Sequence, residues 1–374
     1  MATLCSGGEC VGVGARAAGY RHLWGIECLP EVANVAETNG FRSIIADVRD
    51  VDPRTLERPY ALHVSPPCKE ASGANGRRVE SDDGRELGEV IVHFIEVLQP
   101  EVFTLENVWF YRTFDSFQFI LNRLYALGYM VDYKHVNSAD YGVPQTRMRL
   151  ILRASQWLLP DLPEPEPWIG WYEAIEDLIP NLPDSQFAPW QLERLPESTK
   201  SLLVDSAGYP QGGSRAPVCR EKAEPANTIV ANHGRRPMRA FLVHPTDMRS
   251  MSIREGGKPA FTVMAGSFDE SHAPAWKPRA FLVGSQYAQP NTVKDRRVQV
   301  KDSDEPSFTV VATYKGDKRA WLEDGRVVQL SVRALARLQS IPDTYRLPDK
   351  KALSCYVVGN AVPPLMYQKI ISQL

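Results

Sequence analysis

The 374-residue sequence has almost no excess of charge of either sign, because 43 Lys and Arg face 45 Asp and Glu, a formal net charge of −2. This balance excludes a global positive field that would attract nucleic acid or a membrane, although it does not exclude a local basic face. No run approaches the ~20 apolar residues that a membrane span needs, and no basic and apolar leader opens the chain. We therefore expect a cytoplasmic protein without membrane contact.

Cysteine is also scarce. Six cysteines are scattered along the chain, which is too few for a disulfide framework, and no CxxC pair indicates zinc, so we expect no metal site. Any functional cysteine must be distinguished by its chemistry. With 43% hydrophobic and 24% charged residues, the composition excludes disorder and gives enough mass for two domains.

Residues 1–153 alternate short β-rich runs with helical stretches, which is typical of a doubly wound α/β domain with a Rossmann-like sheet. Apolar residues at 87, 90, 91, 94, 95 and 98 have helical spacing. We expect this helix to connect two parallel strands in a right-handed crossover, so the residues that follow the two strands lie at the same edge of the sheet. Cys68 and Glu106 are two such residues. The strands are expected at 3–5, 23–26, 43–46, 61–65 and 101–105.

The composition changes at 160–167, where four prolines interrupt an acidic segment and indicate a nearby domain boundary. Residues 201–320 are rich in Gly, Pro and short β-like runs, and the similar runs 202–204, 241–243 and 281–283 indicate either a repeated unit or three strands of similar composition. This region has eighteen Lys and Arg against twelve Asp and Glu, so it is locally basic. Its loop cations are solvated charges or readers of DNA: Arg235, Arg236, Arg239, Lys294, Arg296, Arg297, Lys315, Lys318 and Arg319.

A nucleotide-type cofactor site is indicated at the ends of the first strands. A glycine-rich turn that includes Gly7 follows the first strand, and Glu27 ends the second, where an acid can take ribose hydroxyls. Asp47 and Val48 close the next short run and offer a carboxylate and an apolar wall to an adenine, unless Asp47 is simply an exposed turn residue.

Three further segments carry chemistry. Pro66 and Pro67 stiffen a loop that presents Cys68, either as a nucleophile or as a buried structural thiol. Glu106 lies at the next strand end in an apolar setting, where a partly desolvated carboxyl group either gives a proton or is a satisfied structural acid, and Asn107 can fix the loop. Arg147 and Arg149 are expected on one face of a strand, where they need an anionic partner.

The ordered set of motifs resembles the C5-cytosine DNA methyltransferases. The segments that carry this resemblance, in family order, are 4–19, Glu27, Pro67-Cys68, Glu106-Asn107-Val108, Gln145 to Arg149, 333–343 and 359–364. The resemblance implies a catalytic domain of residues 1–170 completed by 350–374, and a smaller β-rich target-recognition domain with hinge at 171–349. It also implies S-adenosylmethionine as cofactor and double-stranded DNA as partner.

In this family's chemistry, Cys68 attacks C6 of a flipped cytosine, Glu106 protonates or hydrogen-bonds N3, and Arg147 supports the base. Arg149 is expected to serve the loop architecture. Asn107, Gln145, Arg149 and Lys69 complete the implied substrate site. The implied cofactor-binding residues are Leu4, Ser6, Gly7, Glu27, Asp47, Val48, Pro66, Leu87, Asn360 and Val362.

The sequence departs from the family pattern at Cys5, where an aromatic residue is usual, and at the turn Gly7-Gly8-Glu9-Cys10. Lys69 replaces a glutamine and either favours the Cys68 thiolate or contacts DNA. An RNA cytosine methyltransferase and a catalytically silent DNA-binding homologue stay as alternatives, whereas a nicotinamide dehydrogenase leaves Pro67-Cys68 unexplained. We expect a monomer, with room for a cognate restriction endonuclease that forms no stable complex with it.

Overall fold

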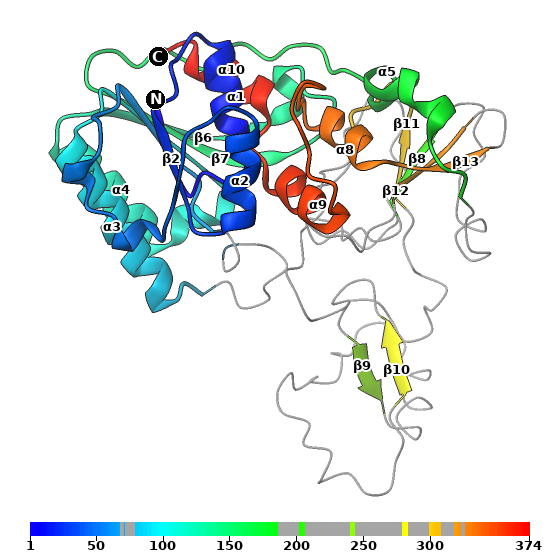
Figure 1. Ribbon diagram of the computed structural model, residues 1–374, viewed down its shortest axis with the longest axis horizontal. Coiled ribbons are helices and arrows are strands. Elements are labelled where there is room, and N and C mark those ends of the chain that lie inside the picture. Colours follow the sequence, from blue (N-terminus) through cyan, green and yellow to red (C-terminus); the bar gives the residue numbers. More distant parts are fainter. Residues whose placement is uncertain are drawn as a thin grey trace, which may run out of the picture.

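A seven-stranded sheet forms the centre of the computed structural model, which describes residues 1–67, 71, 79–185, 202–205, 240–243, 279–282, 299–307, 318–322 and 326–374 (Figure 1). The strand order is β3-β2-β1-β4-β5-β7-β6. The strands are β1 (Ala2–Leu4), β2 (Trp24–Glu27), β3 (Ser43–Ile45), β4 (Ala61–Val64), β5 (Val102–Asn107), β6 (Met130–Asn137) and β7 (Met148–Ser155). The first five are parallel, whereas β7 runs antiparallel to β5 and β6. The α/β fold class predicted from the sequence is confirmed.

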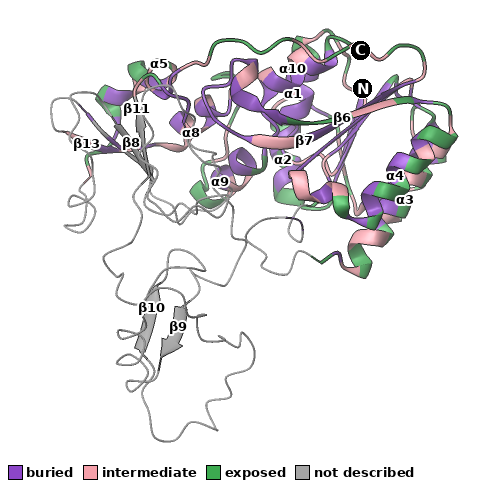
Figure 2. Ribbon diagram, turned by 180° about the vertical axis from the view of Figure 1, so that it is seen from behind, coloured by how far each residue is buried: buried purple, intermediate pink, exposed green. Residues whose placement is uncertain are grey.

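Helices cover both faces of this sheet, as Figures 1 and 2 show. They are α1 (Cys10–Ala17), α2 (Pro30–Thr38), α3 (Asp82–Leu98), α4 (Asp115–Ala126) and α10 (Pro364–Ile371). Successive strand residues alternate between two cores, since Leu62 and Phe103 pack with α3 and α4, whereas Ala61 and Val102 pack with α1 and α10. The short 3-10 helices are η1 (Val48–Asp50), η2 (Pro53–Thr55), η3 (Trp109–Thr113), η4 (Ser138–Tyr141) and η5 (Glu176–Asn181).

Helix α3 begins earlier than the apolar spacing from Leu87 predicts. Its first turn is polar, and the Ser81 side chain caps it by accepting a hydrogen bond from the Gly84 amide at 3.1 Å. The first turn of α3 is polar and shows no hydrophobic periodicity. The start of this helix could therefore be predicted only from a capping residue such as Ser81.

A second core connects the sheet domain to later parts of the chain. Helices α5 (Trp171–Ile175), α8 (Val332–Leu338) and α9 (Lys351–Asn360) contribute to it, together with Cys10 and Val32 from the first forty residues. The expected boundaries at 170/171 and 349/350 fall within the span of this cluster. The division into two domains stays a prediction.

The described β strands of the later region form two small sheets. They are β8 (Leu202–Asp205), β9 (Ala240–Val243), β10 (Arg279–Leu282), β11 (Gln299–Asp302), β12 (Lys318–Trp321) and β13 (Val327–Gln329). The three similar sequence runs correspond to β8, β9 and β10, but β8 pairs with β11 and β12, whereas β9 and β10 pair with each other. The three strands are therefore not equivalently placed. Of the basic loop residues, Lys318 and Arg319 lie in β12, and the other seven lie outside the described residues.

Within the described ranges, no helix is both long and apolar enough to cross a membrane.

Candidate active site

The carboxyl ends of β1, β2, β4 and β5 meet at one edge of the sheet. The order of the sheet reverses between β1 and β4, and in open α/β sheets ligands bind outside the strand ends at such a point. Backbone hydrogen bonds tie the loops at this edge together, from the Ser6 amide to the Ile26 carbonyl at 2.9 Å and from the Ser65 amide to the Leu4 carbonyl at 3.4 Å. The edge is therefore the candidate active site.

Glu27 organises the glycine-rich turn. Its carboxylate accepts hydrogen bonds from the Gly7 amide and the Leu29 amide, each at 2.9 Å, and the side chain is buried. Gly7 has a φ of +56°, a conformation that glycine adopts without strain. A Cβ at this position would meet no atom of the described chain within 4 Å, so there is open space beside the Gly7 backbone.

The surroundings of this turn fit a nucleoside cofactor. The Ser6 hydroxyl oxygen is buried and has no hydrogen-bond partner among the described residues, so a polar ligand group could satisfy it. The Asp47 side chain is 41% exposed and caps η1 by accepting from the Arg49 amide at 3.0 Å. Val48 and Leu87 are buried and pack in the same core as Leu4. A polar group, an acid and an apolar wall are thus present together.

Glu106 forms an ion pair with Arg149 at the end of β5. Arg149 Nε lies 2.9 Å from Glu106 Oε1, and the two side chains are 11% and 9% exposed. The adjacent Asn107 donates from Nδ2 to the Pro66 carbonyl at 3.1 Å and accepts from the Val108 amide at 2.8 Å. Asn107 therefore holds the buried Pro66, the residue that leads towards Cys68, beside Glu106. Cys68 and Lys69 themselves lie outside the described residues.

Arg147 and Gln145 make contacts of a different kind. Arg147 is buried and donates from Nη2 to the Gly359 carbonyl at 3.2 Å, and the buried Gln145 donates from Nε2 to the Leu338 carbonyl at 3.3 Å. Arg149, which lies inside β7, is thus the arginine that pairs with Glu106, whereas Arg147 precedes the first residue of this strand and contacts the Gly359 carbonyl. The assignment of base support to Arg147 and of loop architecture to Arg149 stays a prediction.

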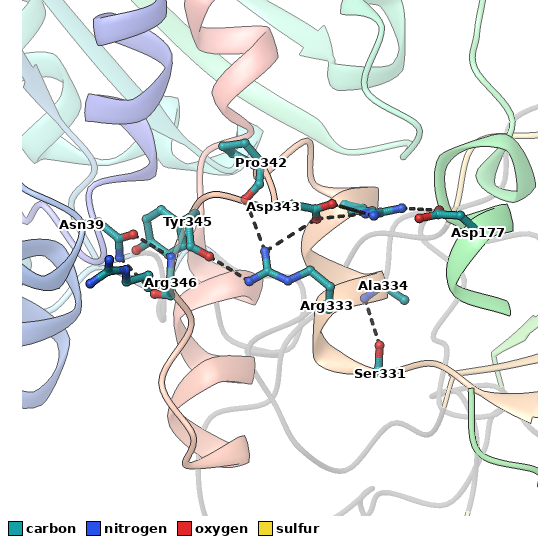
Figure 3. A network of polar contacts seen from close by, with 10 residues as sticks. Asn39, Asp177, Ser331, Arg333, Ala334, Pro342, Asp343, Tyr345 and Arg346 are labelled. Carbon is teal, nitrogen blue, oxygen red and sulfur yellow. Dashed lines mark hydrogen bonds and ion pairs between the residues drawn. The ribbon is translucent and has the colours of Figure 1, made fainter. Parts of the chain in front are cut away.

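The end of the chain closes one side of the glycine-rich turn. The Tyr345 hydroxyl donates to the Gly8 carbonyl. Figure 3 shows how the backbone at Tyr345 is held: Arg333 donates to the carbonyls of Pro342 and Tyr345, at 3.3 and 2.8 Å. Arg337 forms ion pairs with Asp343 and Asp177. Asn360 ends α9 and is exposed, whereas Val362 is buried against α1 and α10.

Two buried polar groups beneath this edge were not anticipated from the sequence. The Glu9 carboxylate is fully buried, accepts a hydrogen bond from the Thr3 hydroxyl and lies 3.1 Å from His22 Nε2. A Cβ at Gly25 would lie 2.0 Å from Glu9 Oε1, and a Cβ at Gly12 would lie 2.7 Å from Oε2. These two glycines make room for the Glu9 side chain. The departure from the family pattern at Glu9 was the available signal.

The second group is a polar chain through the sheet. The buried His63 ring contacts the Ser65 and Thr104 hydroxyls at 2.8 Å each, and Thr104 in turn contacts the Tyr367 hydroxyl at 2.9 Å. Burial lowers the pKa of His63 to about 3, so the ring is neutral near pH 7. A histidine inside an otherwise apolar strand was the signal for this chain. It connects α10 to the loop that follows β4.

The described cysteines are poor nucleophiles. Burial raises the pKa of Cys5 and of Cys10 to about 12 each, and it also raises the pKa of Cys28 and of Cys355. The thiolate is the reactive form of cysteine, so the raised pKa disfavours nucleophilic attack by these four thiols.

Comparison with known proteins matches the whole chain to one family. The sequence profile of the C-5 cytosine-specific DNA methylases matches residues 1–374. Type II methyltransferase M.AgeI of Thalassovita gelatinovora is 26% identical over 97% of this chain and 96% of its own length. Type II methyltransferase M1.HphI of Haemophilus parahaemolyticus is 27% identical over 98% of this chain and 84% of its own length.

Solved structures support the fold. A DNA modification methyltransferase encoded within an Escherichia coli prophage superposes with a TM-score of 0.56 at 16% identity, covering 100% of this chain and 97% of that one. The Entamoeba histolytica methyltransferase EhMeth gives 0.54 at 9% identity, covering 100% and 96%. Since the family profile spans every motif at this sheet edge, the chain belongs to the C-5 cytosine-specific DNA methylase family and is a methyltransferase.

Proposed function

We propose that this chain methylates C5 of a cytosine that is flipped out of a specific sequence in duplex DNA, through a transient bond between Cys68 and C6. The observation that carries this proposal is the contact of Asn107 with the Pro66 carbonyl. It joins Pro66, two residues before Cys68 in the sequence, to Asn107, the residue that follows Glu106. In our proposal, the Cys68 nucleophile and the proton-handling Glu106 act on one substrate at this edge of the sheet.

The choice of Cys68 is supported by its place in the sequence. Burial raises the pKa of Cys5 and of Cys10 to about 12 each, so these two cysteines near the same edge are held as thiols. Cys68 is the one that follows the strand end at the proposed site.

The chain's own residues would activate the base. Addition of the Cys68 thiolate to C6 forms the S–C6 bond, and Glu106, which binds N3 in its protonated form, compensates the charge that develops there by donating a hydrogen bond or transferring that proton. Arg149 orients the Glu106 carboxylate through their ion pair. C5 thereby becomes nucleophilic. After methylation, loss of the C5 proton to a base allows the S–C6 bond to break and returns the thiolate.

The family implies S-adenosylmethionine as the methyl donor, and this group supplies an electrophilic methyl carried on a sulfonium. In our proposal, Glu27 takes the ribose hydroxyls, Asp47 and Val48 the adenine, and the unpartnered Ser6 hydroxyl a polar group of the cofactor. Leu4, Pro66, Leu87, Asn360 and Val362 complete the proposed pocket. The curated relatives are named Type II methyltransferases, which supports a role in restriction-modification.

Bisulfite sequencing tests this proposal. Cells without cytosine methylation of their own would express the wild-type chain or the Cys68→Ser variant. We expect cytosines in one sequence context to resist conversion only with the wild-type chain. Conversion of every cytosine, with the protein expressed and folded, would contradict the proposal. Transfer of tritium from labelled cofactor to duplex DNA and not to tRNA would separate it from an RNA methyltransferase.

A further inference from the structure

A stacked cluster of Trp109, Arg112 and His135 adjoins the proposed active site and takes no part in the function described so far. Trp109 begins η3, three residues after Glu106. The His135 ring stacks on the Trp109 ring, with centroids 4.7 Å apart and an angle of 18° between the planes. The Arg112 guanidinium carbon lies 4.3 Å from the centroid of the same indole.

The Arg112 side chain is held in a fixed position. In addition to the cation–π contact, Nη1 donates to the Trp109 carbonyl at 3.2 Å, and the Arg112 carbonyl accepts from Gln118 Nε2 at 2.9 Å. A guanidinium that is already ordered loses little further entropy when it binds an anion.

This cluster has an excess of positive charge. Within the described part of the chain, no carboxylate lies within ion-pair distance of Arg112, and the nearby Glu106 is already paired with Arg149. Partial burial and the positive charges of Arg112 and Arg149 lower the pKa of His135, so its neutral ring is favoured. Arg112 is therefore the cation of this cluster, and an ordered guanidinium without a carboxylate partner among the described residues favours an anionic ligand.

The cluster lies at the end of the sheet at which, under the proposed function, the DNA substrate approaches. Strand β6 runs parallel to β5, and Leu150 of β7 is the register partner of both His135 and Asn107. His135 and Asn107 are therefore at the same level on either side of β7. A ligand that reaches Glu106 passes close to this level.

We propose that Arg112, positioned by Trp109 and His135, binds a backbone phosphate of the DNA strand beside the target cytosine. This inference rests on the proposed function, since it presumes duplex DNA as substrate. A phosphate fits better than a base, because His135 already occupies a stacking position on Trp109 and the guanidinium fork matches two phosphate oxygens.

The salt dependence of DNA binding tests this inference. Binding to labelled duplexes, with and without the target sequence, would be measured by fluorescence anisotropy from about 50 to about 300 mM salt. Because one phosphate contact contributes about 0.9 to the slope of log affinity against log salt, we expect Arg112→Gln to reduce the slope by about that amount. Affinity should fall equally for both duplexes. Arg112→Lys, which keeps the charge, should retain most of the slope.

Arg123→Gln is the matched control. Arg123 lies on α4 and pairs with Glu96 at 2.6 Å, so the same change of charge there should leave the slope unaltered. A wild-type slope in Arg112→Gln, or a loss confined to the target duplex, would overturn the proposal. Covalent trapping of 5-fluorocytosine duplexes by the wild-type enzyme reports on the proposed function separately. A chain that shows the Arg112-dependent slope and no trapping would refute that function and leave the phosphate site standing.

Discussion

Arg149 Nε lies 2.9 Å from Glu106 Oε1, and both side chains are largely withdrawn from water. The pair joins the antiparallel strand β7 to the carboxyl end of β5. Arg147, two residues earlier, instead donates to the Gly359 carbonyl. Arg149 thus contacts the acid of the proposed active site, and Arg147 connects the sheet to α9.

Substitutions of Arg149 and Arg147 should have different effects. We expect Arg149→Gln to lower kcat by about 100-fold, because the Glu106 carboxylate loses its orienting partner. Arg147→Gln should lower the free energy of unfolding by about 1–3 kcal/mol through the lost bond to Gly359, with a smaller effect on kcat. Methyl transfer at saturating substrates and urea unfolding measure both effects. A larger fall of kcat in Arg147→Gln than in Arg149→Gln would instead support the assignment of base support to Arg147.

Glu9 combines backbone strain with a stabilising side chain. Its φ is +60°, so Glu9→Gly should recover about 1–2 kcal/mol of strain, but it leaves His22 and Thr3 without their buried acceptor. Because each bond to a charged acceptor contributes about 1.5–3 kcal/mol, we expect a net loss of about 2 kcal/mol in the free energy of unfolding.

Gln99 provides the control for this prediction. It also has a positive φ, of +42°, but it is exposed and ends α3. Gln99→Gly should therefore stabilise the protein by up to about 1 kcal/mol. Equal stabilisation by both glycine substitutions in chemical unfolding would show that the Glu9 contacts contribute nothing.

The buried His63 makes stability depend on pH. Its pKa is lowered by burial to about 3, whereas an unfolded histidine titrates near 6.5. Between about pH 6.5 and about pH 3 the unfolded chain binds a proton that the folded chain does not, so stability falls as the pH falls. Between about pH 6 and about pH 5 we expect the wild type to lose about 1 kcal/mol more than His63→Gln. The exposed His93→Gln should behave as the wild type does, and parallel pH profiles for all three proteins would contradict the assignment.

Substitution of Glu27 should weaken cofactor binding and leave DNA binding nearly unchanged. We expect Glu27→Ala to weaken binding of S-adenosylmethionine by about 1.5–3 kcal/mol, through loss of a charged acceptor for the ribose hydroxyls. DNA affinity without cofactor should barely change. The control is Glu31→Ala, which removes an exposed carboxylate that pairs with Lys350. Calorimetry that finds unchanged cofactor affinity in Glu27→Ala would remove Glu27 from the site.

Strands β1, β2, β4 and β5 were predictable from the sequence because they are buried throughout and are mostly apolar, and the short apolar run of β3 was recognised although β3 is partly exposed. The placement of Glu27 and Glu106 at one edge followed from that topology. Strand β6 was not anticipated, because it lies at the edge of the sheet and its exposed residues, which include Lys134 and His135, break the apolar pattern.

The buried polar contacts were less predictable. Whether Arg147 or Arg149 meets Glu106 depends on where β7 begins, and strand ends are poorly determined by local sequence. The contact of Glu9 with His22 depends on the space left by Gly12 and Gly25. The sequence alone does not show this space, because it forms only when α1 packs against β2.

The central claim is that Cys68 forms the covalent bond to the target cytosine, and intact-protein mass spectrometry after incubation with S-adenosylmethionine and a 5-fluorocytosine duplex tests it most directly. Fluorine cannot leave C5 as a cation, so the S–C6 bond should persist. We predict a protein–DNA adduct with the wild type and with Cys219→Ser, and none with Cys68→Ser. An adduct in Cys68→Ser, or no adduct in a wild type that methylates normal DNA, would contradict the account.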